Sequence, residues 1–119
     1  ACDHAAYTEK TVLVKYLKET MPKLEIVDFG TNTPDRCDYP DFAHNLTKEY
    51  SSLKDTTGVK CIVVCGSGIG ISIAANRSEK IRCCLVHNEL EVEKAIEKCQ
   101  ANCISMGAMI LGQELINKM

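Results

Sequence analysis

The sequence predicts an α/β fold in which a mostly parallel sheet carries helices on both faces. Short apolar runs alternate along the chain with segments whose apolar residues recur every three or four positions, and this is the pattern of strands and helices in turn. A glycine-rich loop at 65–70 also joins one apolar run directly to the next helical segment. Ligands bind at the carboxyl ends of the strands in such folds, so this loop is the first candidate for a site.

The first half of the chain supplies two helices and one strand. Helical spacing of apolar residues predicts a helix over 8–21. The apolar run 24–29 predicts a strand that Gly30 closes. A polar loop with two prolines follows, and Asp41 is a suitable N-cap for a helix that reaches Leu53.

In the second half, strands and helices alternate without a break. The expected order is a strand at 61–64, a helix from 71, a strand at 81–86, a helix at 90–99, a strand at 103–106 and a last helix over 111–119. This order predicts a Rossmann-like three-layer sandwich, in which parallel strands end at a common edge.

Composition indicates a single globular domain. The chain has 119 residues, of which 45% are hydrophobic and 25% charged, and its net charge is −2. The basic residues are scattered, which argues against nucleic-acid binding, and no apolar run approaches the ~20 residues of a membrane span. The chain starts at Ala1 with no strand before it, and we expect both ends of the natural polypeptide to be missing.

The eight cysteines do not predict a disulfide scaffold. Four of them lie in or beside apolar runs, where cysteine acts as a small hydrophobe, and no Cys-x-x-Cys pair is present. None of the three histidines has a Cys or His partner at the spacing of a zinc site. We therefore expect reduced thiols in a cytoplasmic protein with no metal and no cofactor.

The loop after the strand at 61–64 combines a thiol with a row of backbone amides. Cys65 ends the apolar run, and Gly66, Gly68 and Gly70 follow it at alternate positions. A strand, a glycine loop and a helix start together collect N–H groups that favour an anion. The same field favours a thiolate, so the segment predicts an anion cradle beside a base or nucleophile.

The residue at position 71 excludes three well-known loops. Ile71 stands where a Walker A loop needs lysine, where a dinucleotide fingerprint needs its third glycine, and where a cysteine phosphatase needs arginine. A thiol beside backbone amides, without a cation in the loop, suits an oxyanion built on carbon, such as an enolate.

Four segments, 2–7, 27–30, 37–41 and 65–76, carry a recognisable pattern. Together they resemble the type B ribose-5-phosphate isomerases, a family that includes galactose-6-phosphate isomerase subunits, and the likeness covers essentially the whole chain. The resemblance implies an aldose–ketose isomerase of pentose phosphate metabolism that interconverts ribose 5-phosphate and ribulose 5-phosphate through an enediolate. It also implies that 1–119 is one sugar-phosphate isomerase domain lacking its first strand and its C-terminal tail. Its partners would be a small sugar phosphate and further copies of itself, in a homodimer or homotetramer with a shared active site.

The resemblance also assigns roles to residues of the loop and of two other segments. Cys65 is the base that moves the proton between C1 and C2, and Ser67 shuttles protons between the two oxygens. The positions that match substrate contacts are Asp3, His4, Tyr39, Gly66, Gly68, Ile69 and Gly70. Simpler roles are open for some of them, since Cys65 could be a core thiol, Asp3 a helix cap and Tyr39 a packing residue of its loop.

Three positions depart from the family pattern. Lys98 stands where the family has the histidine that opens the furanose ring across a subunit interface, and Cys99 replaces a substrate-contacting asparagine. Met109 replaces an arginine. We keep Lys98 and Cys99 as candidate contacts, and two alternatives stay open. One is a hexose-6-phosphate isomerase of the same family, and the other is a sugar-phosphate-binding partner subunit that has lost part of its machinery.

Overall fold

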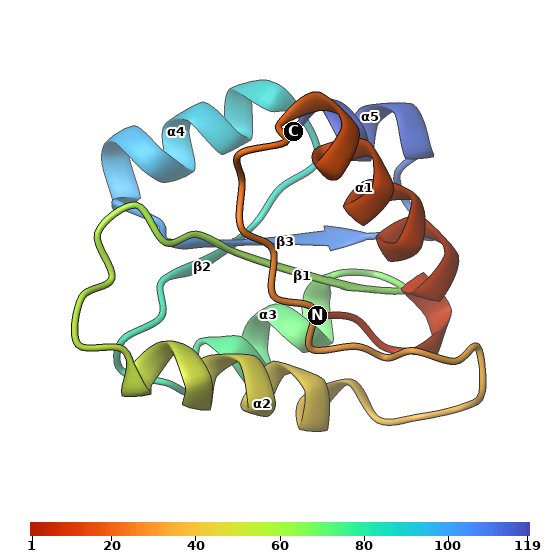
Figure 1. The fold of residues 1–119 in the computed structure, drawn as a ribbon, viewed down its shortest axis with the longest axis horizontal. Coiled ribbons are helices and arrows are strands. Elements are labelled where there is room, and N and C mark those ends of the chain that lie inside the picture. The colour runs from red at the N-terminus through yellow and green to blue at the C-terminus, as the bar shows by residue number, and fades with distance from the viewer.

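Three parallel strands form the centre of the computed structural model, which describes residues 1–119 (Figure 1). They are β1 (Cys61–Cys65), β2 (Cys83–Leu85) and β3 (Cys103–Gly107), in the spatial order β1-β3-β2. Because all three run in the same direction, their carboxyl ends lie at one edge of the sheet. Strands were expected at all three places, and β2 is shorter than the run 81–86 suggested.

Helices cover both faces of this sheet, so the predicted fold class is confirmed (Figure 1). A short 3-10 turn, η1 (His4–Ala6), leads into the first helix. One face carries α1 (Tyr7–Thr20), α4 (Glu89–Cys99) and α5 (Gln113–Lys118), and the other carries α2 (Tyr39–Ser52) and α3 (Ile69–Ala75). No helix is both long and apolar enough to cross a membrane.

The alternation of side chains along β1 explains why the core has two parts. Val63 and Cys65 belong to an apolar cluster with α2 and α3, whereas Val64 belongs to a second cluster with α1, α4 and α5. Successive side chains of a strand point to opposite faces, so one strand supports both layers. The last residue of β1 is therefore fixed in the core at the edge where the glycine loop begins.

The strand expected over 24–29 is not formed. The segment runs irregularly between α1 and α2, and none of residues 25–29 makes a backbone hydrogen bond to another part of the chain (Figure 1). Only the two residues that follow it, Gly30 and Thr31, exchange backbone hydrogen bonds with Cys2. The apolar content of 24–29 suggested a strand, but a strand also needs a hydrogen-bonded neighbour along its length. Here the only such neighbour is Cys2, which pairs with the residues directly after the segment.

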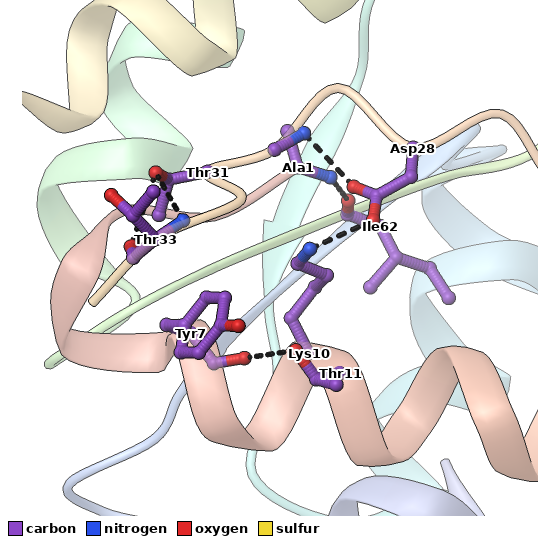
Figure 2. Close-up of polar contacts among 9 residues, drawn as sticks. Ala1, Tyr7, Lys10, Thr11, Asp28, Thr31, Thr33 and Ile62 are labelled. Carbon is purple, nitrogen blue, oxygen red and sulfur yellow. Dashed lines mark hydrogen bonds and ion pairs between the residues drawn. The ribbon is translucent and has the colours of Figure 1, made fainter.

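Residues 1–3 continue the sheet beyond β1. The backbone nitrogen of Ala1 donates to the carbonyl of Ile62 at 2.9 Å (Figure 2), and Val64 N donates to the Ala1 carbonyl at 3.0 Å. Asp3 N then donates to the Val64 carbonyl at 3.3 Å. This parallel pairing delivers Asp3 and the residues after it to the carboxyl edge, beside the glycine loop.

An ion pair fastens the irregular segment to α1. Lys10 Nζ lies 2.7 Å from Asp28 Oδ2 (Figure 2). Gly30 N donates to Asp28 Oδ1 at 2.9 Å. Partial burial alone would raise the pKa of Asp28, but the hydrogen bonds from Lys10 and Gly30 and the charge of Lys10 lower it overall. The pair thus holds Gly30 where it can bond to Cys2, at the start of the site.

The helix expected from Asp41 begins two residues earlier, at Tyr39. Asp38 occupies the N-cap position without a side-chain hydrogen bond, and Asp41 lies inside the first turn. Pro40 fits this first turn because its missing N–H would have no partner there in any case. The shift matters because it places Tyr39 at the tip of α2 rather than in the preceding loop.

Candidate active site

Cys65 lies at the junction of β1 and the glycine loop. Its side chain is buried, with 4% of the residue exposed, and its Sγ accepts a hydrogen bond from Gly68 N at 3.2 Å. Gly68 has a φ of +77°, and a Cβ there would lie 2.8 Å from the Met106 carbonyl carbon and 2.9 Å from Gly107 N. Only glycine lets the loop turn this closely against β3.

Residues of β3 and the turn after it hold the loop in place. Ser105 is completely buried, and its hydroxyl donates to the Gly68 carbonyl at 2.6 Å. The backbone nitrogens of Ala108 and Met109 donate to the carbonyls of Cys65 and Gly66, both at 2.9 Å. The sequence analysis missed Ser105, although a hydroxyl in an apolar strand needs a partner and is a usable signal.

Several amides of the loop have no acceptor. Gly68 N is used by Cys65 Sγ, and Ile69 N donates to Ser67 Oγ at 3.2 Å. In contrast, the amides of Gly66, Ser67 and Gly70 make no hydrogen bond within the chain. No acidic side chain occurs in the loop, so these donors next to the Cys65 sulfur can receive an anionic oxygen.

Tyr39 packs directly on the loop although it is 31 positions away from Gly70 in the sequence. A Cβ at Gly70 would lie 2.6 Å from Tyr39 Cζ and 2.8 Å from its hydroxyl oxygen. The tyrosine ring therefore covers the one side of Gly70 that a side chain would occupy. The first turn of α2 thus places the Tyr39 hydroxyl next to Gly70.

The Asp3–His4 segment also lies beside the loop. Asp3 is buried, and its Oδ1 caps η1 by accepting from Ala5 N at 3.0 Å. His4 Nδ1 lies 3.2 Å from Cys37 N and 3.0 Å from Cys37 O, so the backbone of Cys37 holds the ring and leaves Nε2 for another partner. The Ala5 methyl lies 3.5 Å from the position of a Cβ on Gly66.

Position 109 lies over the loop from the β3 side. A Cβ on Gly66 would lie 2.9 Å from Met109 Sδ, and Met109 is 81% exposed. Its neighbour Ile110 is 61% exposed. The mouth of the site thus has an apolar rim where the family resemblance led us to look for a cation.

Lys98 and Cys99 do not reach the loop of their own chain. Both are exposed at the end of α4, four to five positions before Cys103, which pairs with Cys61 at the amino end of the strands. Cys65 pairs with Gly107 at the opposite end. The five residues of β1 separate the two ends by about 13 Å.

Two cavities of the single chain have volumes of about 630 and 410 Å³, and no residue of 65–70 lines either of them. No cluster of three or more His, Cys, Asp or Glu residues could hold a metal ion. The chemistry available at the loop is therefore that of a thiol, a hydroxyl, a carboxylate, an imidazole and free backbone amides.

The remaining strand cysteines differ from Cys65. All eight cysteines are unpaired, and Cys61, Cys103 and Cys83 lie side by side at the amino end of the sheet. Burial raises the pKa of Cys61 to about 11, and a hydrogen bond with Cys83 together with burial raises the pKa of Cys103. Cys61 and Cys103 therefore stay protonated, and all three cysteines are buried core residues.

Comparisons with known proteins show the family to which the chain belongs. The family model described as Ribose/Galactose Isomerase matches residues 1–119. A ribose-5-P isomerase B of Listeria innocua is 32% identical, and the match covers 96% of this chain and 74% of the Listeria protein. A D-erythrulose-4-phosphate isomerase of Pectobacterium atrosepticum is also 32% identical, and the match covers 95% of this chain and 72% of the Pectobacterium protein. The structure of Clostridium thermocellum ribose-5-phosphate isomerase B superposes with a TM-score of 0.89 at 32% identity, over 98% of this chain and 76% of that one. The chain belongs to the ribose/galactose isomerase family, and it is a sugar-phosphate isomerase of the aldose–ketose type.

Proposed function

We propose that the enzyme interconverts ribose 5-phosphate and ribulose 5-phosphate through an enediolate, with Cys65 as the base. The observation that carries this proposal is the sulfur of Cys65 next to the free amides of Gly66, Ser67 and Gly70. A base and a set of unsatisfied N–H donors are what proton transfer beside a carbonyl requires.

The proposed reaction moves one proton between two carbons of the open-chain sugar. The Cys65 thiolate removes the proton from C2 of the aldose, and the electron pair shifts to give an enediol with negative charge on oxygen. The free amides stabilise this charge by several kcal/mol, since they need no reorganisation. Ser67 moves a proton from the C2 hydroxyl to the C1 oxygen, and Cys65 returns its proton to C1 to give the ketose.

The other residues around the loop would bind and orient the sugar phosphate. Asp3 has one carboxylate oxygen without a hydrogen bond, His4 has a free Nε2, and the Tyr39 hydroxyl lies next to Gly70. Gly68 and Ile69, which shape the turn, complete the proposed set of substrate-binding residues. Lys98 and Cys99 would act only on the loop of a second copy, so we propose a homodimer or homotetramer with a shared site.

The choice of ribose 5-phosphate rests on the names of relatives and is open to direct test. The Listeria and Clostridium proteins are named for ribose 5-phosphate, whereas the Pectobacterium relative is named for a four-carbon sugar phosphate. Purified enzyme is assayed with ribose 5-phosphate, allose 6-phosphate, galactose 6-phosphate and erythrulose 4-phosphate. We expect the highest kcat/KM for ribose 5-phosphate. No turnover of any of them would favour the alternative of a binding subunit.

The role of Cys65 is tested by two substitutions and one control. Cys65→Ala and Cys65→Ser remove the thiolate, and we expect each to lower kcat more than tenfold, which corresponds to about 1.4 kcal/mol of barrier or more. Because Cys65 is buried, Cys65→Ala also lowers the free energy of unfolding, by about 1 kcal/mol. The control is Cys103→Ala, which removes a thiol of similar burial from the other end of the sheet and retains activity. Retention of more than a tenth of kcat in Cys65→Ser would exclude Cys65 as the base.

We further propose that residues 1–119 act as one isomerase domain, because both layers of helices share a single sheet. Unpaired cysteines fit a cytoplasmic location, where thiols stay reduced.

A further inference from the structure

One of the two cavities described above lies at the amino end of the strands, away from the Cys65 loop. Its volume is about 630 Å³, within the usual range of small-molecule sites. The end of α2, the connection from α2 to β1, the residues before β2 and the connection from α4 to β3 line it. We call it the basic cavity, because its charged lining residues are Lys54, Lys60, Lys80 and Arg82.

The charge of this cavity is opposite to that of the whole chain. Four cationic side chains converge there and no Asp or Glu lines it, although the net charge of the protein is −2. The nearby carboxylate of Asp55 accepts a hydrogen bond from Thr57 N at 2.8 Å and is not part of the lining. Such a concentration of one charge attracts a ligand with several negative charges.

Two of the four cations are held in place by the backbone. Arg82 donates from Nε and Nη2 to the Gln100 carbonyl, at 2.9 and 2.6 Å, and Lys80 Nζ donates to the Ser51 carbonyl at 2.9 Å. Both keep further N–H donors, and Lys54 and Lys60 make no ion pair or hydrogen bond. Anchored cations lose less conformational entropy when a ligand binds, which favours affinity.

The cavity also offers an aromatic hydroxyl and an apolar wall. Tyr50 is only 7% exposed, and its hydroxyl accepts from Asn102 Nδ2 at 3.1 Å while its own proton has no acceptor. Leu53, Val59 and Ile96 add apolar surface, and Leu53 and Ile96 are exposed. A ligand that used the whole lining would carry an apolar or planar part besides its charges.

We propose that the basic cavity binds an organic polyphosphate of nucleotide size. One phosphoryl group carries a charge of about −2 and would leave part of the four positive charges uncompensated, whereas two or three linked groups match them. A sugar monophosphate has too few charges and no apolar part, so the cavity is not a second copy of the isomerase site. Within one chain, the basic cavity lies at the opposite end of the sheet from the Cys65 loop, so binding there can be measured separately from isomerisation.

Residue-resolved titrations test this site separately from the isomerase loop. ¹⁵N-labelled protein is titrated with inorganic phosphate, pyrophosphate and ATP while the amide shifts are followed. We expect ATP to shift the amides of 54–60, 80–82 and 100–102 with a Kd at least tenfold lower than that of inorganic phosphate. Shifts confined to 65–71, or an ATP affinity no higher than that of phosphate, would overturn the proposal.

A charge-matched pair of variants completes the test. Lys54→Gln/Lys60→Gln removes two cations from the basic cavity and should raise the Kd of ATP at least tenfold. Lys18→Gln/Lys23→Gln removes the same charge from exposed positions outside the cavity and should leave the Kd unchanged. Equal weakening in both variants would show a non-specific charge effect and would also overturn the proposal.

Discussion

The two cysteines that begin and end β1 show how position sets the behaviour of a thiol. Cys61 lies among other core thiols, and burial raises its pKa to about 11, so it remains protonated at neutral pH. Cys65 lies at the carboxyl end, where a backbone amide is directed at its sulfur and three more amides are free. Sequence position alone separates the two, because the glycine loop follows only one of them.

A substitution at Gly70 tests the contact with Tyr39. In Gly70→Ala, the new methyl would lie 2.6 Å from Tyr39 Cζ, so the ring must move. If Tyr39 touches the substrate, we expect KM for ribose 5-phosphate to rise about three- to tenfold, with a loss of stability of about 1–2 kcal/mol. Steady-state kinetics and urea denaturation measure the two effects.

Gly112→Ala is the matched control for this substitution. A methyl group there meets no atom within 4 Å, and its φ of −73° suits alanine, so KM and stability should change little. An unchanged KM in Gly70→Ala, despite lower stability, would leave Tyr39 as a packing residue only.

Much of the site could be predicted from sequence because it is local. The strand end, the thiol and the glycine loop are consecutive residues, and their chemistry follows from their order. The contacts of Gly70 with Tyr39 and of Gly66 with Met109 join segments about 30 to 45 positions apart. Spacing within one segment carries no information on such contacts. The family resemblance implied a site role for Tyr39, but only the structure shows that its ring packs on Gly70.

At the scale of elements, the segment 24–30 shows where a local pattern fails. Its apolar residues suggested a strand, but whether a strand forms depends on a neighbour that the pattern does not contain. The segment is held instead by the Lys10–Asp28 pair and by the bonds of Gly30 and Thr31 to Cys2. The helices were easier to predict, because their hydrogen bonds lie within the element itself.

The Lys10–Asp28 pair should make stability depend on pH. The pKa of Asp28 in the folded protein lies below its value in the unfolded chain. The ionised carboxylate therefore contributes fully to the free energy of unfolding above about pH 5, and this contribution is lost as the pH falls below about 4. At pH 7 we expect Asp28→Asn to cost about 1–3 kcal/mol, since it leaves the nearly buried Lys10 without its charged partner. Urea denaturation of both proteins between pH 7 and pH 3 measures the difference.

The difference between wild type and Asp28→Asn should shrink towards zero at the acid end of this range. Asp35→Asn serves as the control, because Asp35 is exposed and makes no ion pair, and its cost should stay near zero throughout. A cost for Asp28→Asn that does not change with pH would mean that it comes from packing and not from the charge.

At the scale of the whole molecule, the candidate site residues lie at two opposite ends of the sheet. The loop, Asp3, His4 and Tyr39 lie at one end of the sheet, and Lys98 and Cys99 lie at the other. No rearrangement within a rigid sheet brings the two ends together. A contribution of Lys98 to catalysis therefore requires a second copy of the chain.

Mixed assemblies test this shared site and the role of position 98 together. A lysine ammonium is a poor base at neutral pH, whereas imidazole titrates close to neutrality and can assist ring opening. Subunits that carry Cys65→Ala and Lys98→His have no base of their own but offer an imidazole to a partner. When these subunits are mixed with wild-type subunits, the turnover of ribose 5-phosphate per subunit that retains Cys65 should rise.

The direction of the gain identifies the step that it affects. Ribulose 5-phosphate has no furanose form to open, so a gain in ring opening should favour the forward reaction when chemical-step rates are compared. The control is the Cys65→Ala single variant, mixed with wild-type subunits in the same ratio. It supplies no imidazole, so the turnover per subunit that retains Cys65 should not rise. A gain seen in the Lys98→His single variant but not in the mixture would place the effect within one chain, contrary to the 13 Å that separate the two ends of β1. Equal gains in both directions would mean that position 98 acts on proton transfer and not on the ring.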